Sequence, residues 1–230
     1  MDPASVAGPA EWTQRRWPAL PNGPSVGGMA ALSLTGSDAR ARTIKPRAVG
    51  ARYGRDMFET AEELAALQAL LDRSHAGATE HLQSIINDDR VLSARDLVAL
   101  LTGMKVLSVA TVTAAGEPRI SALDGHFLHG TWSFSTSGTA LKARHMRARP
   151  AVSVAHVDGE ELAVFSHGHV AEMTDEDADW TPTLEHWSRH YGSSPLDWGD
   201  DIRLYRYTAT WMVGYAFKRA ELLEQRGVVS

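Results

Sequence analysis

The sequence predicts a mainly β protein with helices, folded as a six-stranded antiparallel barrel, and three observations support this fold class. Apolar and polar residues alternate in short runs, which is typical of half-buried strands. Turn signals separate these runs at hairpin spacing, and Asp158-Gly159 is the strongest of them. Helical patterns lie between some of the runs, as in small barrels with flanking helices. The expected strands cover residues 106–113, 118–123, 131–134, 151–157, 161–173 and 202–217.

The last of these strands is long, and the sequence predicts either one strand or a bent pair with the bend near Ala209 and Thr210. The turn between the first two strands falls at residues 114–117, and Asp124-Gly125 predicts another turn directly after the second strand. The barrel is therefore expected to occupy residues 104–230.

Residues 57–103 are predicted to form a helical segment in front of the barrel. Thr60 is followed by two acidic residues, which is a good helix start, and Ser93 is the expected cap of a later helix. An apolar stripe at helical spacing follows Thr60 and is expected to pack in a core. Its members are Leu64, Leu67, Leu70 and Leu71.

Residues 1–56 differ from the rest of the chain. They hold 8 Lys and Arg against 4 Asp and Glu, and 6 of the 10 prolines. No periodic apolar pattern lasts more than a few residues there. We expect a largely disordered extension, with Met57 as the functional start of the protein.

Composition narrows the function classes. The sequence has no cysteine, which excludes disulfides, thiolate catalysis and cysteine ligands to a metal. The formal net charge is −5, and residues 57–230 carry 15 basic against 24 acidic side chains, so we expect no nucleic-acid partner. We find neither a bilayer-length apolar run nor a signal sequence, and we expect a cytoplasmic protein with no membrane association.

Short hydroxyl side chains gather between the strand at 131–134 and a basic helix that ends before Pro150. They are Ser135, Thr136, Ser137 and Thr139, and Lys142 follows in the first turn of the helix. A helix N-terminus with hydroxyls and a lysine can bind a phosphate. The same pattern also suits an ordinary N-cap followed by a solvated basic face, and local pattern alone leaves both interpretations open.

The order of elements adds information. Strand, turn with Gly116-Glu117-Pro118, strand, Ser-Thr turn, Lys-bearing helix, strand and hairpin follow one another over residues 97–217. This succession resembles the pyridoxamine 5′-phosphate oxidase-like flavin-binding split barrels, and within them the flavin/deazaflavin-dependent oxidoreductases. The resemblance implies a split barrel that binds FMN or the deazaflavin coenzyme F-420. It also implies a homodimer with a shared cofactor groove, and a redox reaction on a small organic substrate that the sequence does not identify.

The family grips the cofactor phosphate from two places, and the resemblance carries this over to two groups of residues. In this sequence Arg119 on the second strand matches the first place, and Thr136 and Lys142 match the second. The other predicted cofactor-binding residues lie beside these three: Ile120 and Ser121 on the strand, with Ser121 expected near the isoalloxazine edge, and Ser135, Ser137 and Thr139 in the hydroxyl-rich turn. Asp124 stands where the family has a lysine, and Leu141 where it has an arginine. Either Asp124 points outward at the Asp-Gly turn, or the phosphate is held differently, with His126 and Arg144 as substitute donors.

The histidines leave further alternatives. His167 and His169 would share one face of a strand, but no carboxylate completes a clear site, so we predict no metal. Haem is the less expected cofactor, with His126, His145 and His167 as possible ligands. The alternative function is a non-catalytic flavin, haem or tetrapyrrole carrier. We assign no catalytic residue, because in flavin enzymes the cofactor supplies the chemistry. For the dimer contact, the apolar surface is expected from residues 202–217 and the first helices.

Overall fold

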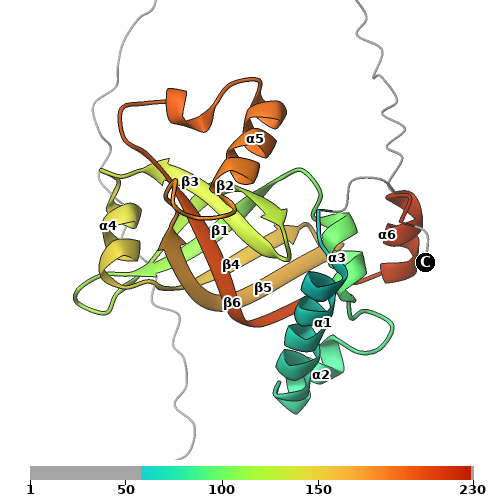
Figure 1. Cartoon of the computed structure of the whole chain (residues 1–230). Coiled ribbons are helices and arrows are strands. Elements are labelled where there is room, and N and C mark those ends of the chain that lie inside the picture. The colour runs from blue at the N-terminus through green and yellow to red at the C-terminus, as the bar shows by residue number, and fades with distance from the viewer. Residues whose placement is uncertain (1–57, 229–230) are drawn as a thin grey trace, which may run out of the picture. The chain divides into compact units, whose positions relative to one another are not determined.

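The computed structural model of the protein describes residues 58–228, so the predicted extension at 1–56 lies outside the described residues. Six antiparallel strands close into a barrel in the order β1-β2-β3-β6-β5-β4, which confirms the predicted fold class (Figure 1). The strands are β1 (Met104–Val112), β2 (Pro118–Leu128), β3 (Thr131–Ser137), β4 (Ala151–Asp158), β5 (Leu162–Glu172) and β6 (Ile202–Ala216).

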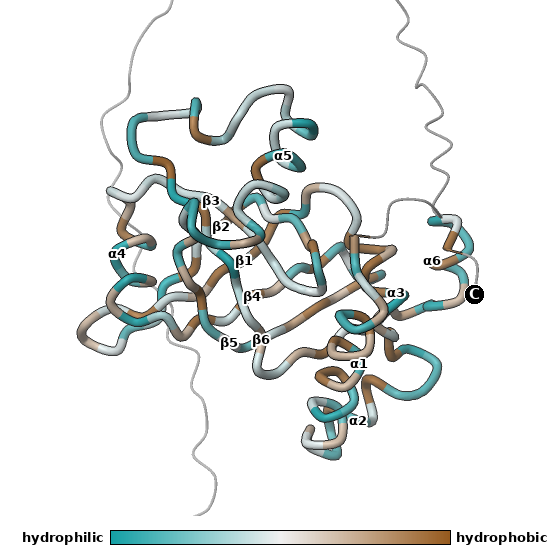
Figure 2. Tube along the Cα trace, in the orientation of Figure 1, coloured by the Kyte–Doolittle hydropathy of each residue, from teal (hydrophilic) through white to brown (hydrophobic). Residues whose placement is uncertain are grey.

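Alternation along the strands fills the interior of the barrel with apolar side chains. Leu107, Val109, Phe134, Val154 and Tyr207 are almost completely buried. Hydrophobic segments accordingly recur along the strands in Figure 2. This burial of apolar surface is the main stabilising contribution to the fold.

The second strand is longer than predicted. Asp124 and Gly125 lie within β2, so the turn predicted at these residues is wrong; the chain reverses at His129 and Gly130, whose φ angles are 55° and 71°. Gly125 is glycine for packing, because a Cβ there would come within 2.9 Å of the Leu107 Cγ. The Asp-Gly dipeptide therefore looks like a turn signal in the sequence, whereas its glycine leaves room for the buried Leu107 side chain.

β2 and β3 pair over only part of their length. Residues Gly125 to Leu128 pair with Thr131 to Phe134. Beyond these pairs the two strands separate, so the start of β2 pairs only with β1 and the end of β3 only with β6. This opening, which we call the split, exposes backbone groups at one end of the barrel.

β6 runs between β3 and β5 over 15 residues. Its register with β5 shifts where His167 faces Trp211 and Gly168 faces Ala209, which leaves Thr210 as an extra residue. The bend predicted at Ala209 and Thr210 is thus confirmed as a β-bulge.

The N-terminal helices are α1 (Ala61–Ala76), α2 (Glu80–Ile85) and α3 (Ala94–Leu100), and they begin after the capping side chains of Thr60, Thr79 and Ser93. Leu64, Leu67 and Leu71 are buried in the same core as the barrel. The surface that was expected from the first helices for a dimer contact is therefore covered within the chain. The same holds for β6, whose Tyr205 and Tyr207 are buried.

Helices α1 and α3, together with the segment between α2 and α3, also fasten the last strand. The Ser74 hydroxyl accepts a hydrogen bond from the Met212 N–H, and the Leu92 N–H donates to the Gly214 carbonyl. Asp96 on α3 binds Arg219 at the start of α6 (Arg219–Gln225), with Oδ2 to Nη2 at 2.8 Å.

Two further helices lie near the split. α4 (Leu141–Ala148) covers the barrel end at which β1 finishes, and α5 (Trp180–Tyr191) covers the outer side of β2 and β3 (Figure 1). A short 3-10 helix, Pro195–Asp197, lies between α5 and β6. The helix predicted at 183–191 is thus confirmed, and it begins three residues earlier than predicted.

Candidate functional site

The N-terminus of α4 is uncapped. Its N-cap residue is Ala140, and among residues 58–228 no side chain accepts a hydrogen bond from the first turn. Ser137 and Thr139 instead contact each other, with their hydroxyl oxygens 2.8 Å apart, and the Thr139 N–H donates to Ser137 Oγ. The interpretation of these hydroxyls as an ordinary N-cap is therefore wrong. The first-turn N–H groups of α4 have the partial positive charge of a helix start, and the described part of the chain offers them no side-chain acceptor.

The turn before α4 is held from the other side by the start of β6. The Gly138 N–H donates to the Asp201 carbonyl at 2.7 Å, and a Cβ at Gly138 would overlap the Asp201 carboxylate. Arg203 Nε binds that carboxylate at 2.6 Å. The backbone hydrogen bond between Gly138 and Asp201 fixes the position of the hydroxyl-bearing turn.

Arg119, Ile120 and Ser121 lie on the part of β2 that borders the split. The Arg119 guanidinium binds Glu117 at 2.6 Å, and both side chains are more than half exposed, at 55% and 57%. Ser121 is half-buried on the same side of the strand as Leu123, whereas Ile120 points to the opposite side and is 75% exposed.

The structure brings the elements of both predicted groups to one end of the barrel. Arg119 pairs in register with Thr111 of β1, and the Thr111 hydroxyl lies 3.0 Å from Nδ1 of His145 on α4. Arg149, just after α4, donates from Nε to the Val112 carbonyl at 2.7 Å. β2, the hydroxyl turn and α4 therefore surround the split, although no hydrogen bond joins Arg119 to Lys142 among the described residues.

Two side chains near the predicted site face elsewhere. Asp124 is exposed on the side of β2 opposite to Arg119, so it points outward by strand alternation and not by a turn. His126 lies on that same outer side and is buried beneath α5, so it cannot replace the missing phosphate donor. Arg144 is an exposed residue of α4.

A cluster of imidazoles under α5 was not predicted. His126 Nδ1 lies 3.0 Å from His186 Nε2, and His126 Nε2 lies 3.3 Å from the Tyr191 hydroxyl. The His190 ring is 4.8 Å from the His126 ring. Burial, with His186 and His190 nearby, lowers the pKa of His126 to about 3. The available sequence signal was the spacing of His186 and His190, four residues apart on one face of an amphipathic helix.

The possible haem ligands do not converge. His126 is under α5, His145 is on α4, and His167 is on the outer side of β5, where it contacts Ser153 at 2.8 Å and stacks on Trp211. Within residues 58–228, no group of three or more His, Asp or Glu side chains is arranged to hold a metal ion. No helix in that part of the chain has the length and apolarity that a membrane crossing requires.

Comparison with known proteins gives matches among solved structures only. No protein-family model matches the chain, and no curated protein matches it. A protein of unknown function from Agrobacterium tumefaciens matches with a TM-score of 0.43 and 21% identity, over 50% of this chain and 51% of the other. This chain thus spans about half the length of that protein.

Two other matches have named ligands or activities. A FAD-binding protein from Mesorhizobium loti matches with a TM-score of 0.45 and 23% identity, over 55% of this chain and 94% of that one. A protein described as an F420 reductase matches with a TM-score of 0.40 and 20% identity, over 50% and 93%. Proteins described as FAD-binding and as an F420 reductase are therefore among the solved structures that part of this chain resembles, at low sequence identity.

Proposed function

We propose that this chain binds a flavin-type cofactor at the split and is a cytoplasmic oxidoreductase for a small organic molecule. One observation carries the proposal: the uncapped N-terminus of α4 lies at the barrel end where β2 and β3 separate. A phosphate placed there would accept hydrogen bonds from first-turn N–H groups and would interact favourably with the helix dipole.

The surrounding side chains suit the same ligand. The hydroxyls of Ser137 and Thr139 already face each other, and Ser135 and Thr136 precede them on β3. Lys142 is half-buried in the first turn of α4. A lysine adds a charge-assisted hydrogen bond to a phosphate oxygen. In the proposed complex the cofactor ring then extends along the split toward Ser121.

The division of chemistry follows from this arrangement. The bound cofactor supplies two-electron transfer, and the chain's own residues bind, orient and shield it. FMN and the deazaflavin coenzyme F-420 both carry a phosphate and both fit the proposal. Arg119 is paired with Glu117, so it has to leave that carboxylate before it can bind a phosphate.

A second copy of the chain is the proposed partner. Exposed apolar side chains lie on the outer sides of β1, β2, β4 and β5. They are Val106, Ile120, Val157 and Phe165. An exposed apolar surface of this kind is typical of a protein interface. Because Ile120 stands between Arg119 and Ser121, a homodimer through this face would place a partner beside the split.

An absorbance spectrum and a titration test the function. The purified full chain should bind FMN or coenzyme F-420 with a dissociation constant in the micromolar range or below, and reduction of the bound cofactor should be reversible. Lys142→Ala should weaken binding about ten- to a hundredfold. Binding that does not respond to Lys142→Ala would contradict the location. Cofactor binding without turnover of any reductant or acceptor would favour the carrier alternative, and an intense Soret band would favour haem.

A further inference from the structure

The imidazole cluster under α5 is not used by the proposed function, and it holds the helix on the barrel. His126 comes from β2, whereas His186, His190 and Tyr191 come from the C-terminal half of α5. His126 is 1% exposed, and its ring also packs against Trp187 at 4.8 Å. Both ring nitrogens of His126 have a partner on α5, so contact between β2 and this half of the helix depends on the protonation of imidazoles.

Within residues 58–228, few acidic side chains lie near this cluster to balance protons on it. Burial lowers the pKa of His186, and the nearby Arg189 and His190 lower it further. The carboxylate that acts on the cluster is Asp124 on β2, which with burial raises the pKa of Tyr191. From β3 the nearest group is the neutral Ser133, which accepts a hydrogen bond from Trp187 Nε1, and from the N-terminal side Phe58 faces His186.

The hydrogen bond between the His126 and His186 rings survives the addition of one proton but not of two. With His126 neutral, one nitrogen donates and the other accepts. A proton on either ring leaves one N–H between His126 and His186. A second proton places two N–H groups head to head across 3.0 Å and breaks the bond. A charge on His190, 4.8 Å away, adds repulsion.

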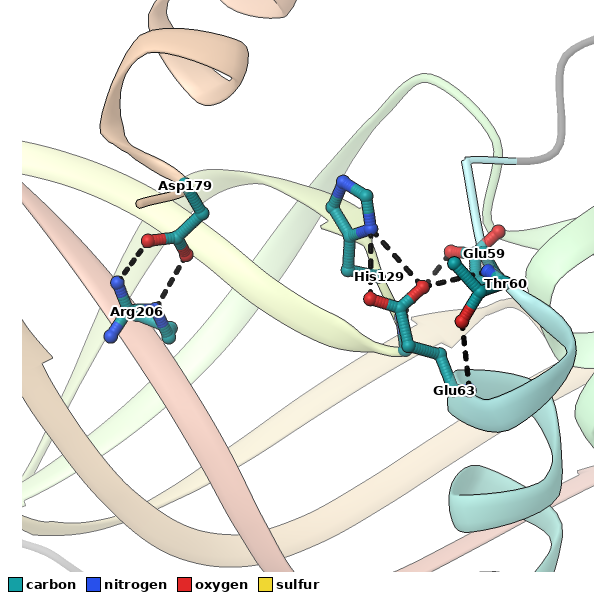
Figure 3. Close-up of polar contacts among 7 residues, drawn as sticks. Glu59, Thr60, Glu63, His129, Asp179 and Arg206 are labelled. Atoms are coloured by element: carbon teal, nitrogen blue, oxygen red, sulfur yellow. Dashed lines mark hydrogen bonds and ion pairs between the residues drawn. The ribbon is translucent and has the colours of Figure 1, made fainter. Parts of the chain in front are cut away.

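The two ends of the α5 region are fastened differently. Before α5, Arg206 of β6 binds Asp179 through Nε at 2.6 Å (Figure 3). The same guanidinium also binds Asp177. A backbone hydrogen bond from Thr174 and the Arg206 guanidinium lower the pKa of Asp177, so this pair persists in mild acid. After α5, the Asp201 carbonyl holds Gly138, and Arg203 holds the Asp201 carboxylate. Neither fastening depends on a histidine.

We infer that α5 is a hinged, acid-loosened cap: below about pH 6 its C-terminal half detaches from β2 more readily, while the ends of the region stay attached through Arg206 and Asp201. Release uncovers His126, Ser133 and Trp187 on the outer side of the barrel. It also gives freedom to the segment 192–200, which leads directly to the Gly138 contact beside the split.

The size of the effect follows from proton linkage. A histidine with a pKa of 6.5 when released and about 3 when docked weakens docking about 30-fold at pH 5, and by very little at pH 7.5. The sign is that of a base whose pKa is lowered in the docked state: docking is favoured above pH 6.5 and weakens as pH falls. Burial of the Trp187 side chain opposes release.

Hydrogen exchange of the full chain, expressed as protection factors at pH 7.5 and pH 5, tests the cap. Protection over residues 184–191 should fall at least tenfold at pH 5, while that of β5 should change less than twofold. His126→Gln should remove most of the fall. Because that variant can fail to fold, His186→Gln/His190→Gln, which changes less buried rings, should also reduce it several-fold. His169→Gln, an exposed histidine on β5, is the matched control and should behave as the parent.

Three outcomes would overturn the inference. One is unchanged protection of α5 between the two pH values. Another is loss of protection in β5 together with α5, since that indicates global acid unfolding. The third is a parental response in the folded His186→Gln/His190→Gln variant, because the acid sensitivity would then come from other groups.

Discussion

Arg119 provides the sharpest test of the cofactor site, because the structure shows what competes with the phosphate. Its guanidinium binds Glu117 at 2.6 Å with both side chains more than half exposed. An exposed pair of this kind is worth about 0.2–1 kcal/mol. A charge-assisted hydrogen bond to phosphate contributes about 1.5–3 kcal/mol. The net contribution of Arg119 to binding should therefore be about 1–2 kcal/mol, or roughly five- to thirtyfold in affinity.

Two substitutions with opposite signs separate these contributions. Arg119→Ala should weaken FMN binding by that factor, whereas Glu117→Gln should tighten it up to about fivefold, because it frees the guanidinium. Fluorescence titration of FMN at fixed low salt measures both. Lys218→Ala is the control, since this lysine pairs with Glu221 and lies after β6 at the opposite end of the barrel. Equal affinity of Arg119→Ala and the parent would remove Arg119 from the phosphate site, and weaker binding by Glu117→Gln would show that the pair itself organises the site.

Four other expectations concern stability and charge. Gly168→Ala should destabilise by about 2–4 kcal/mol in urea unfolding, because its Cβ would lie 2.8 Å from the Ala209 Cα and overlap the Thr208 carbonyl; a loss below 1 kcal/mol would mean that the bulge yields. Trp187→Ala should cost about 3–5 kcal/mol in the same assay, and an unchanged midpoint would show that α5 is not packed as described. Burial raises the pKa of Glu63, but hydrogen bonds from Thr60 and His129 lower it more, so this carboxylate stabilises the fold above pH 4.5 and less as the pH falls. Glu63→Gln should therefore flatten the dependence of the urea midpoint on pH between pH 6 and pH 3. An unaltered pH profile would contradict the contact between Glu63 and His129 in Figure 3. Asp124→Lys should leave FMN affinity within twofold, whereas a large gain would place this side chain at the phosphate.

Local patterns predicted much of this fold because strands and caps are encoded over a few residues. The alternation in β1 and β5, the Asp158-Gly159 hairpin and the cap at Thr60 all depend on neighbours in the sequence. Gly125 misled the prediction, because the atom that requires a glycine there belongs to Leu107 on another strand. The sequence alone cannot distinguish a glycine needed for a turn from one needed for packing.

In the candidate site, too, local patterns could be predicted from the sequence, whereas contacts between distant residues could not. That hydroxyls precede α4 could be predicted, but whether they cap the helix depends on a backbone conformation that Asp201, more than sixty residues later, helps to fix. The imidazole cluster also joins residues about sixty positions apart. Such contacts are set by register and helix placement, which single-sequence periodicity does not specify.

The position of β6 has a consequence for synthesis of the protein. The last strand lies between β3 and β5, and the N-terminal segment holds it through Ser74 of α1 and through Leu92, which precedes α3. During synthesis, β3 and β5 therefore have unpaired edges, and α1–α3 lack the strand on which they pack, until almost the whole chain has emerged from the ribosome. Open strand edges invite pairing with other chains. A nascent chain that stalls before residue 202 would thus be aggregation-prone although it already contains five of the six strands.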